Sequence, residues 1–193
     1  AGKEELVNQG KVPPSIRDCL KRLQTHGNPY GLSPAKRANW ASDMEVDTYL
    51  DQEYLFYVGD IGSYDDRGKE IARSVANLLK KANVEFGILG KEEVSDGNDA
   101  KAMGEIELAK MLAEKNIETF HKKGINKVIT LSPHAFNSMK NDYPAIGAHF
   151  NVFHYSQVLA NLPKQVTFDE SRSPTRITYH DSCYLGRHNA EYA

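Results

Sequence analysis

The sequence predicts an α/β fold of the Rossmann-like class, with a parallel sheet of about four to five strands flanked by helices. Short apolar runs typical of buried strands alternate along the chain with longer segments whose apolar residues recur at helical spacing. The helical segments are long enough to serve as the crossovers that parallel strands require. These two features favour a parallel sheet covered by helices on both faces.

The expected elements follow one another closely. Strands are expected at 54–58, 84–89, 127–131, 150–154 and 176–180. Helices are expected at about 66–82, 99–123 and 134–141, and a further helix should carry Val158, Leu159 and Leu162. The apolar stripes predicted for the two longer helices are Ile71, Val75, Leu78 and Leu79, and then Ile106, Ala109, Leu112, Ala113, Ile117 and Phe120. Gly124 should end the longest helix as its C-cap.

The domain organisation is expected to have three parts. Residues 1–48 should form a helical arm or linker, residues 49–175 the α/β domain, and residues 176–193 the start of a further motif. Within the arm, a short helix should follow the proline pair at 13–14 and end at Gly27.

A second brief helix is expected in the arm. Ser33 before Pro34 is typical of an N-cap followed by proline at the first helical position. We expect this helix to extend through Trp40, whose large side chain should pin the arm to the domain.

Composition excludes several classes of function. The formal net charge is −2, and lysine and arginine are interspersed with aspartate and glutamate, so we expect no nucleic-acid partner. No window reaches the ~20 apolar residues of a membrane span, and the start of the chain lacks the apolar core of a signal peptide. A cytoplasmic location is therefore expected.

The two cysteines provide little chemistry by themselves. Cys19 and Cys183 are far apart and belong to no CxxC pair, so neither a disulfide framework nor a thiolate metal site is expected. Cys19 lies among the apolar residues of the arm helix and should be a small packed side chain. Cys183 should be an exposed thiol near the chain end.

Polar residues follow three of the predicted strands. Asp60, then Ser95 with Asp96, and then Ser132 with Ala135 three residues later should gather at one edge of the sheet, where parallel sheets bind ligands. No GxGxxG accompanies the first strand, which argues against a dinucleotide.

Two interpretations of these residues remain open from chemistry alone. Asp60 and Asp96 could hold Mg²⁺ or a phosphoryl group, with Ser132 nearby. The simpler explanation, which we favour, is that they are turn residues that accept backbone hydrogen bonds. Ser132 lacks a GxSxG setting and is explained as an N-cap before Pro133, and His134 as a surface residue in the first turn of a helix.

The spacing of these positions resembles the spacing of a known family motif. Written out, they read D-x34-SD-x35-SxxA. With cysteine at each lettered position, this pattern resembles the cysteine-rich CCG motif of the B and D subunits of heterodisulfide reductase and of glycolate-oxidase-type iron-sulfur subunits. YVGDIGSYDDR is similar to the family's YVGC-x-x-SYD, FGILGKEEVSDGND to its FGILG-x-EE-x-CCG, and TLSPHAFNSMKNDYP to its T-x-CPHCFN-x-x-KNEYP.

The resemblance implies a cofactor that the ligand positions do not support. Family members bind an iron-sulfur cluster, yet the five corresponding positions here carry no thiolate, and Ala135 carries no donor atom. We therefore expect no cluster in this domain. The closing ITYHDSCYLGRHN resembles the start of a second such motif, in which Cys183 would be the first ligand, close to His180 and His188.

By this resemblance, the chain is a fragment of an electron-transfer oxidoreductase subunit of heterodisulfide-reductase type, with this domain as a cluster-free scaffold. The implied partners are a ferredoxin-type domain and a flavoprotein or a membrane quinone-linked protein, which would place the chain at the membrane periphery. The fragment alone is expected to be inactive. The alternatives are the cation- or phosphoryl-binding module described above and a purely structural interaction domain.

Overall fold

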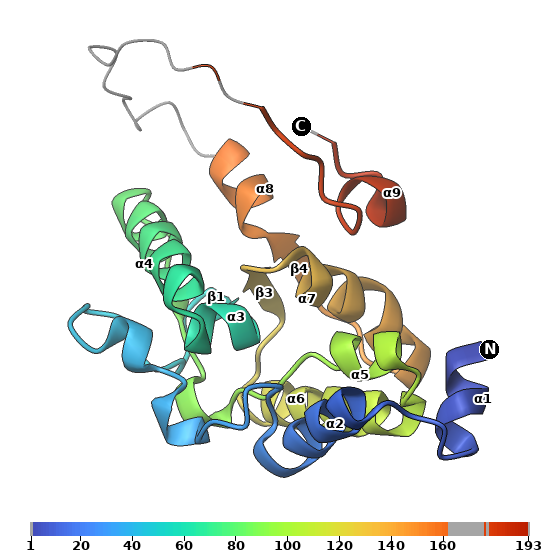
Figure 1. Cartoon of the computed structure of the whole chain (residues 1–193). Helices are drawn as coiled ribbons and strands as arrows, with labels where there is room; N and C mark the ends of the chain where they lie inside the picture. Colours follow the sequence, from blue (N-terminus) through green and yellow to red (C-terminus); the bar gives the residue numbers. More distant parts are fainter. Residues whose placement is uncertain (1, 162–175, 177, 193) are drawn as a thin grey trace.

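The computed structural model describes residues 2–161, 176 and 178–192, and contains a four-stranded parallel sheet between helices (Figure 1). The strands are β1 (Tyr54–Tyr57), β2 (Phe86–Gly87), β3 (Lys127–Thr130) and β4 (Asn151–His154). Their order is β2-β1-β3-β4, and all three pairings are parallel. The predicted α/β class is confirmed.

The strand order indicates which edge of the sheet can bind a ligand. From β1 the chain crosses first to β2 on one side and then to β3 on the other, so the connections diverge between β1 and β3. A crevice at the carboxyl ends of the strands forms at such a switch point. The register pairs Phe56 with Ile129 and Tyr57 with Thr130, so the loops after these two strands begin side by side.

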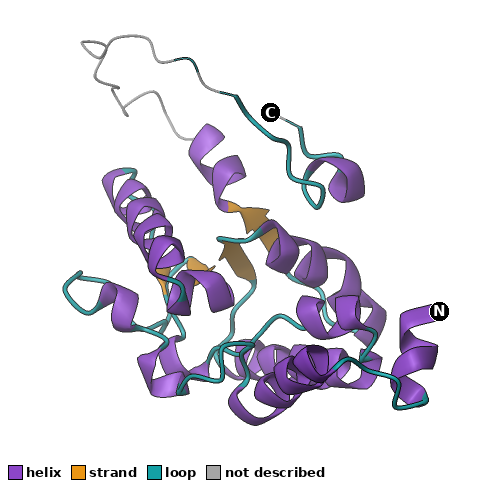
Figure 2. Cartoon of the chain, in the orientation of Figure 1, coloured by secondary structure: helices purple, strands orange, loops and turns teal. Residues whose placement is uncertain are grey.

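The sheet is covered on both faces by the helices shown in purple in Figure 2. The helices are α1 (Gly2–Asn8), α2 (Pro14–His26), α3 (Gly59–Tyr64), α4 (Asp66–Lys81), α5 (Asn98–Met103), α6 (Ile106–Lys122), α7 (Pro133–Asn137), α8 (Tyr155–Ala160) and α9 (Gly186–Asn189). Short 3₁₀ turns span Pro34–Lys36, Asn39–Ala41, Gly90–Glu92 and Tyr143–Ile146, and a π-helical turn spans Ser138–Asp142.

The side chains of β1 alternate between two cores, as a strand's pleat requires. Leu55 and Tyr57 pack on the face covered by α6, where Phe120 joins them. Phe56 and Val58 pack on the opposite face, against α4 and α8. The predicted two-sided burial of the sheet is thus confirmed.

The stripe predicted for α4 is partly wrong. Ile71 and Leu78 are 45% and 37% exposed, whereas Ala72 and Ala76 are fully buried. The face in contact with the sheet is the run Ala72, Val75, Ala76 and Leu79, which has the i, i+3, i+4, i+7 spacing of one helical stripe. Two alanines in that stripe allow α4 to approach the sheet closely. The stripe predicted for α6 has a similar error, because Ile106 at its start is exposed.

The helix expected over 99–123 is broken in two. Gly104 has a φ of +97° and separates α5 from α6. A left-handed residue cannot continue a right-handed helix, and glycine adopts this conformation at little cost. The absence of a side chain at Gly104 also gives α1 room to pack, because a Cβ there would lie 2.7 Å from the backbone carbon of Lys3.

The strand expected at 176–180 is absent from the residues described there. Residues 176 and 178–180 are exposed and belong to no strand, and Ile177 lies outside the described residues, as does Leu162 of the helix expected after β4. A β-favouring sequence forms a strand only where it can pair with a neighbouring strand. Here Tyr179 and His180 lie instead beside the carboxyl ends of the strands.

The arm is organised largely as predicted. α2 ends at Gly27, which has a φ of +66°. The Oγ of Ser33 accepts a hydrogen bond from a backbone N–H, but the helix expected to reach Trp40 forms two 3₁₀ turns instead. The Trp40 side chain is buried edge-on against Phe56, so it does pin the arm to the domain.

A third core holds α2 against the domain. Leu23 is fully buried with Val94 and Leu108, and Cys19 packs against this cluster, as predicted for a small apolar residue.

We predict that Gly97→Ala destabilises the protein more than Gly124→Ala does. Both glycines have positive φ angles, +89° and +68°. A left-handed alanine costs roughly 1–2 kcal/mol. At Gly97 the new Cβ would also lie 2.7 Å from the backbone oxygen of Ala109, whereas at Gly124 no atom lies within 4 Å.

The overpacking at Gly97 should therefore add about 1–3 kcal/mol to the loss in the free energy of unfolding. Urea denaturation of both variants measures the difference. Equal losses would mean that the approach of α6 to this loop does not constrain the fold.

Candidate functional site

The residues that follow the strands meet in one cavity of about 560 Å³ at the carboxyl edge of the sheet. Asp60, Ser95, Asp96 and Ser132 all line it. Ala135 does not line it and is fully buried behind it. The structure therefore brings four of the five sequence-predicted positions to one surface. Their role as family ligand positions stays a prediction.

Asp60 occupies the first turn of α3, directly after β1, where the sequence predicted a polar turn. Its Oδ1 lies 2.6 Å from the Nη2 of Arg37, a residue of the arm. The two side chains are only 10% and 3% exposed. Because the pair is buried, removing Arg37 would leave the Asp60 carboxylate without a cation.

Glu93 completes the ion pair and was missed by sequence reasoning. Its carboxylate accepts hydrogen bonds from the backbone N–H groups of Val58 at 3.2 Å and Gly59 at 2.8 Å, and lies 3.5 Å from the Nη1 of Arg37. The Glu93 side chain is 2% exposed. Its place in the FGILG-x-EE segment of the family resemblance is the signal that could have found it, whereas its partners in the fold are distant in sequence.

Burial controls the protonation of the acidic groups. It raises the pKa of Asp60 to about 6, with Arg37 opposing the shift. It raises the pKa of Glu93 to about 7, against the same arginine and the two backbone donors. The pKa of Asp96 is also raised by burial to about 7, opposed by the hydrogen bond from the N–H of Asn98, and the charges of Asp60 and Asp99 add to this increase. The cavity thus concentrates carboxyl groups that resist ionisation.

Ser132 is the N-cap of α7, as predicted. Its Oγ accepts the N–H of His134 at 3.1 Å, and the Nδ1 of His134 lies 3.4 Å from the same oxygen. The hydroxyl group is therefore already engaged with the backbone. His134 is exposed, in agreement with the prediction of a surface residue.

The C-terminal segment, residues 178–192, forms one wall of the cavity. Tyr179, His180, Ser182 and Leu185 contribute to the lining. The ring of Tyr184 lies 4.5 Å from that of His134 and 4.8 Å from that of His188. Cys183 is exposed and does not line the cavity.

A salt bridge and polar contacts attach this segment to the domain. The Nζ of Lys140 lies 3.0 Å from a carboxylate oxygen of Glu191. The amide of Asn189 donates to the Oδ1 of Asn137 at 3.0 Å and receives a hydrogen bond from Asn141 at 2.9 Å. The segment that resembles the start of a second motif therefore rests directly on the first site.

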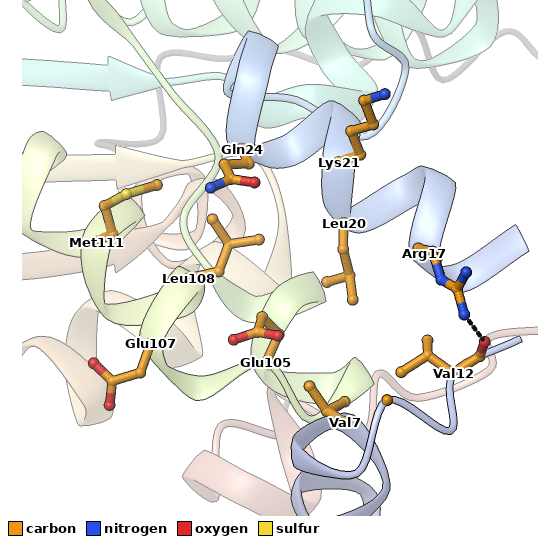
Figure 3. Close-up of a pocket in the computed structure, with 11 residues that line it drawn as sticks. Val7, Val12, Arg17, Leu20, Lys21, Gln24, Glu105, Glu107, Leu108 and Met111 are labelled. Carbon is orange, nitrogen blue, oxygen red and sulfur yellow. Dashed lines mark hydrogen bonds between the residues drawn. The ribbon is translucent and has the colours of Figure 1, made fainter. Parts of the chain in front are cut away.

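A second cavity of about 560 Å³ lies between the arm and α6 (Figure 3). Its walls are mainly apolar, with Leu20 of α2 facing Leu108 of α6. Arg17 at its rim donates to the backbone oxygen of Val12. Neither the sequence-predicted positions nor the buried carboxyl groups reach this cavity, so the functional assignment rests on the sheet edge.

The residues at the sheet edge do not fit an iron-sulfur cluster. None of the five positions carries a thiolate, Asp60 is held by Arg37, and Ala135 has no donor atom. Within the described part of the chain, no three side chains of histidine, cysteine, aspartate or glutamate gather in a way that could hold a metal ion.

Comparison with known families identifies the class of this domain. The model of the CCG cysteine-rich domain matches residues 56–140, which include the end of β1, all of β3 and the five sequence-predicted positions. The α/β domain of this chain belongs to the CCG cysteine-rich domain family.

Three relatives are named as oxidoreductases or as a reductase subunit. The chain is 40% identical, over 97% of its length, to the probable iron-sulfur-binding oxidoreductase FadF of Bacillus subtilis, and 36% identical, over 95%, to an EtfAB:quinone oxidoreductase of Syntrophomonas wolfei. It is 32% identical, over 96%, to the D subunit of the dihydromethanophenazine:CoB–CoM heterodisulfide reductase of Methanosarcina mazei. The chain spans 28%, 27% and 47% of these three relatives.

No solved structure matches the chain. In the part of the chain that the structure describes, no helix has both the length and the apolar character needed to cross a membrane.

We predict that Arg37→Gln destabilises the fold by about 3–5 kcal/mol, because it leaves two carboxyl groups buried without their cation. The matched control is Lys127→Gln. Lys127 pairs with Glu53 at 2.7 Å, but both side chains are more than 40% exposed. An exposed pair of this kind contributes about 0–1 kcal/mol. Urea unfolding of the two variants tests the comparison, and similar losses would contradict a central role for Arg37.

We further predict that stability falls as the pH rises from about 4 to about 7. The pKa values of Asp60, Glu93 and Asp96 in the folded protein, about 6 to 7, lie above their ordinary values of 3.8 and 4.5. In this window the unfolded chain has released protons that the folded chain retains, so the free energy of unfolding decreases as the pH rises.

Asp96→Asn should reduce the loss in the free energy of unfolding across this window by on the order of 2 kcal/mol. The amide keeps an acceptor for the N–H of Asn98 and does not ionise. Asp18→Asn, on the exposed side of α2, is the control. Urea unfolding at a series of pH values supplies the measurement. A wild-type stability that rises through this window would contradict the prediction.

Proposed function

We propose that this chain is part of an iron-sulfur electron-transfer oxidoreductase subunit of the heterodisulfide-reductase type, and that its domain at 49–175 is a cluster-free scaffold. Membership of the CCG family and the three iron-sulfur oxidoreductase relatives support the first half. One observation carries the second half: at the edge where the family pattern has cysteines, Asp60 is engaged with Arg37.

The ion pair closes the position to iron. The Oδ1 of Asp60 is engaged by a buried guanidinium at 2.6 Å, so a metal at this position would have to share the carboxylate with Arg37 and would face its positive charge. The remaining positions offer hydroxyl, carboxyl and methyl groups, none of which replaces a thiolate in a typical cluster. The scaffold would therefore be stabilised by contacts among its own side chains and not by a cluster.

The role of the scaffold would be to position redox groups held by its neighbours. Residues 1–48 would lead in from a ferredoxin-type domain, and residues 176–193 would begin a second motif, with Cys183 as its first ligand. The contact between the C-terminal segment and the first site supports this arrangement, because it holds the start of the second motif at a defined distance from the domain.

The proposed partners are redox proteins, either a flavoprotein or a membrane quinone-linked protein. Support comes from the name of one relative, an EtfAB:quinone oxidoreductase, and from another that is named a probable membrane-anchored ferredoxin, of Chromohalobacter salexigens. Such partners would hold the protein at the membrane periphery.

The magnesium or phosphoryl alternative has less support. Asp60 and Asp96 do share the cavity, as that hypothesis requires. However, Asp60 is neutralised by Arg37, and Ser132 is engaged as a helix cap. A purely structural interaction domain would have the same residues at the cluster positions and would differ only in lacking redox neighbours.

We predict that the chain, after anaerobic incubation with iron and sulfide, retains neither. A variant with cysteine at positions 60, 95, 96, 132 and 135 should bind both and should develop iron-sulfur absorbance, because the backbone that positions these residues is already in place. The control variant carries serine at the same five positions and should remain colourless.

Iron and acid-labile sulfide assays provide the measurement. Stoichiometric iron and sulfide in the unmodified chain would refute the cluster-free scaffold. A five-cysteine variant that folds but binds nothing would refute the assignment of these positions to the family's ligands.

A further inference from the structure

The cavity between the arm and α6, the arm groove, is open and mainly apolar. Its apolar side chains come from three parts of the chain: Val7 and Val12 at the start of the arm, Leu20 on α2, and Leu108 with Met111 on α6. Figure 3 shows Leu20 and Leu108 on opposite sides of the space between the two helices. Met111 is 45% exposed. Apolar side chains gathered in an open groove are typical of a docking site.

The two helices that border the arm groove present opposite charges to it. Arg17 and Lys21 lie one turn apart on α2, whereas Glu105 is the N-cap of α6 and Glu107 lies in its first turn. None of these four side chains has an ion-pair partner among the described residues. The groove therefore has a basic wall on α2 and an acidic wall on α6, and neither wall is neutralised by the other.

The length of the arm groove matches about two turns of a helix. Its lining residues run from Arg17 to Gln24 on α2 and from Glu105 to Met111 on α6. At 1.5 Å per residue, each stretch rises roughly 10 Å. A helix suits a space that two other helices border, because its side-chain ridges enter the grooves of theirs.

Other occupants match the arm groove less well. A two-fold interface with a second copy of this chain would place the same patch on both partners. Because this patch is concave, the two copies would face each other across an unfilled space. A small amphiphile with one charged group would match one wall only. A helix that carries a different charge on each flank matches both walls.

We propose that the arm groove binds an amphipathic helix of a partner protein, whose apolar stripe enters the groove between an acidic flank and a basic flank. The stripe would lie against Leu20, Leu108 and Met111, with the acidic flank beside α2 and the basic flank beside α6. This docking goes beyond the proposed function. It does not depend on whether the sheet edge holds a cluster, because the two cavities share no lining residue.

Three synthetic helices of about fifteen residues test the proposal. All three carry leucine at the i, i+4, i+7 spacing of a groove-binding stripe and differ only in their flanks. The mixed peptide has glutamate along one flank and lysine along the other. The acidic peptide has glutamate on both flanks, and the basic peptide has lysine on both. Each peptide is titrated into the ¹⁵N-labelled chain, and binding is followed by NMR.

The mixed peptide should shift the amide signals of residues 17–24 and 105–111. It should bind about tenfold or more tightly than either of the others, because each of those places half of its charges against like charges. The chain has a formal net charge of −2, so non-specific attraction alone would favour the basic peptide. A preference for the mixed peptide therefore reports the two walls of the arm groove.

A charge-reversal variant tests the basic wall. Arg17→Glu combined with Lys21→Glu makes both walls acidic, so it should weaken binding of the mixed peptide about tenfold and shift the preference to the basic peptide. The matched control is Arg67→Glu combined with Lys81→Glu. It makes the same change in charge at exposed positions on α4, which covers the opposite face of the sheet, and should keep the original preference.

A second variant tests the apolar contact. Met111→Gln removes apolar surface that the stripe would cover and should weaken binding of the mixed peptide about three- to tenfold. The control is Leu78→Gln on α4, where the side chain is 37% exposed and does not line the arm groove. This control should bind the mixed peptide as the unmodified chain does.

The proposal would be overturned if the basic peptide bound as tightly as the mixed one, if the shifts lay outside the arm groove, or if no peptide bound at millimolar concentration. Self-association of the chain that Met111→Gln abolishes in sedimentation equilibrium would also overturn it, because the groove would then hold a second copy. The comparison among peptides on the unmodified chain does not depend on whether any variant folds. The iron and sulfide assays test the proposed function separately, since they report on the sheet edge.

Discussion

The site depends on the buried guanidinium of Arg37, which joins three separate parts of the chain. It comes from the arm, pairs with Asp60 at the start of α3, and faces Glu93 in the segment after β2. Glu93 in turn accepts the backbone N–H groups at the end of β1, so one cation holds two carboxyl groups and the turn between them. Because burial raises the cost of an unpaired charge, the loss of Arg37 would leave both carboxyl groups without their cation.

The residues at the positions that resemble the family's cysteines each have a role in the local structure. Asp60 pairs with Arg37, Asp96 accepts the N–H of Asn98 at the start of α5, and Ser132 caps α7. Each makes a local contact that stabilises the loop in which it lies. Ala135 is packed in the core and needs no partner. In the cluster-free scaffold that we propose, these side chains would hold the shape of the loops.

Local patterns allowed much of the fold to be predicted, and tertiary contacts account for the errors. The apolar run at 54–58 became β1, and Gly27 ended α2, because both signals depend on neighbouring residues alone. The strand at 176–180 did not form in its described residues, since a strand needs a partner that the sequence does not specify. The helix over 99–123 broke at Gly104, whose positive φ ends α5 and whose missing side chain leaves room for α1.

The sequence by itself determined the α/β class, the family resemblance and the convergence of Asp60, Asp96 and Ser132, because strand periodicity and spacing place residues at the carboxyl ends of parallel strands. Only the tertiary structure decided the state of those residues. Glu93 accepted the backbone N–H groups after β1, Arg37 reached Asp60 across 23 positions of sequence, and the Nε2 of His154 was left without a hydrogen-bond partner among the described residues. Burial and pairing depend on contacts between distant segments, and no local pattern records them.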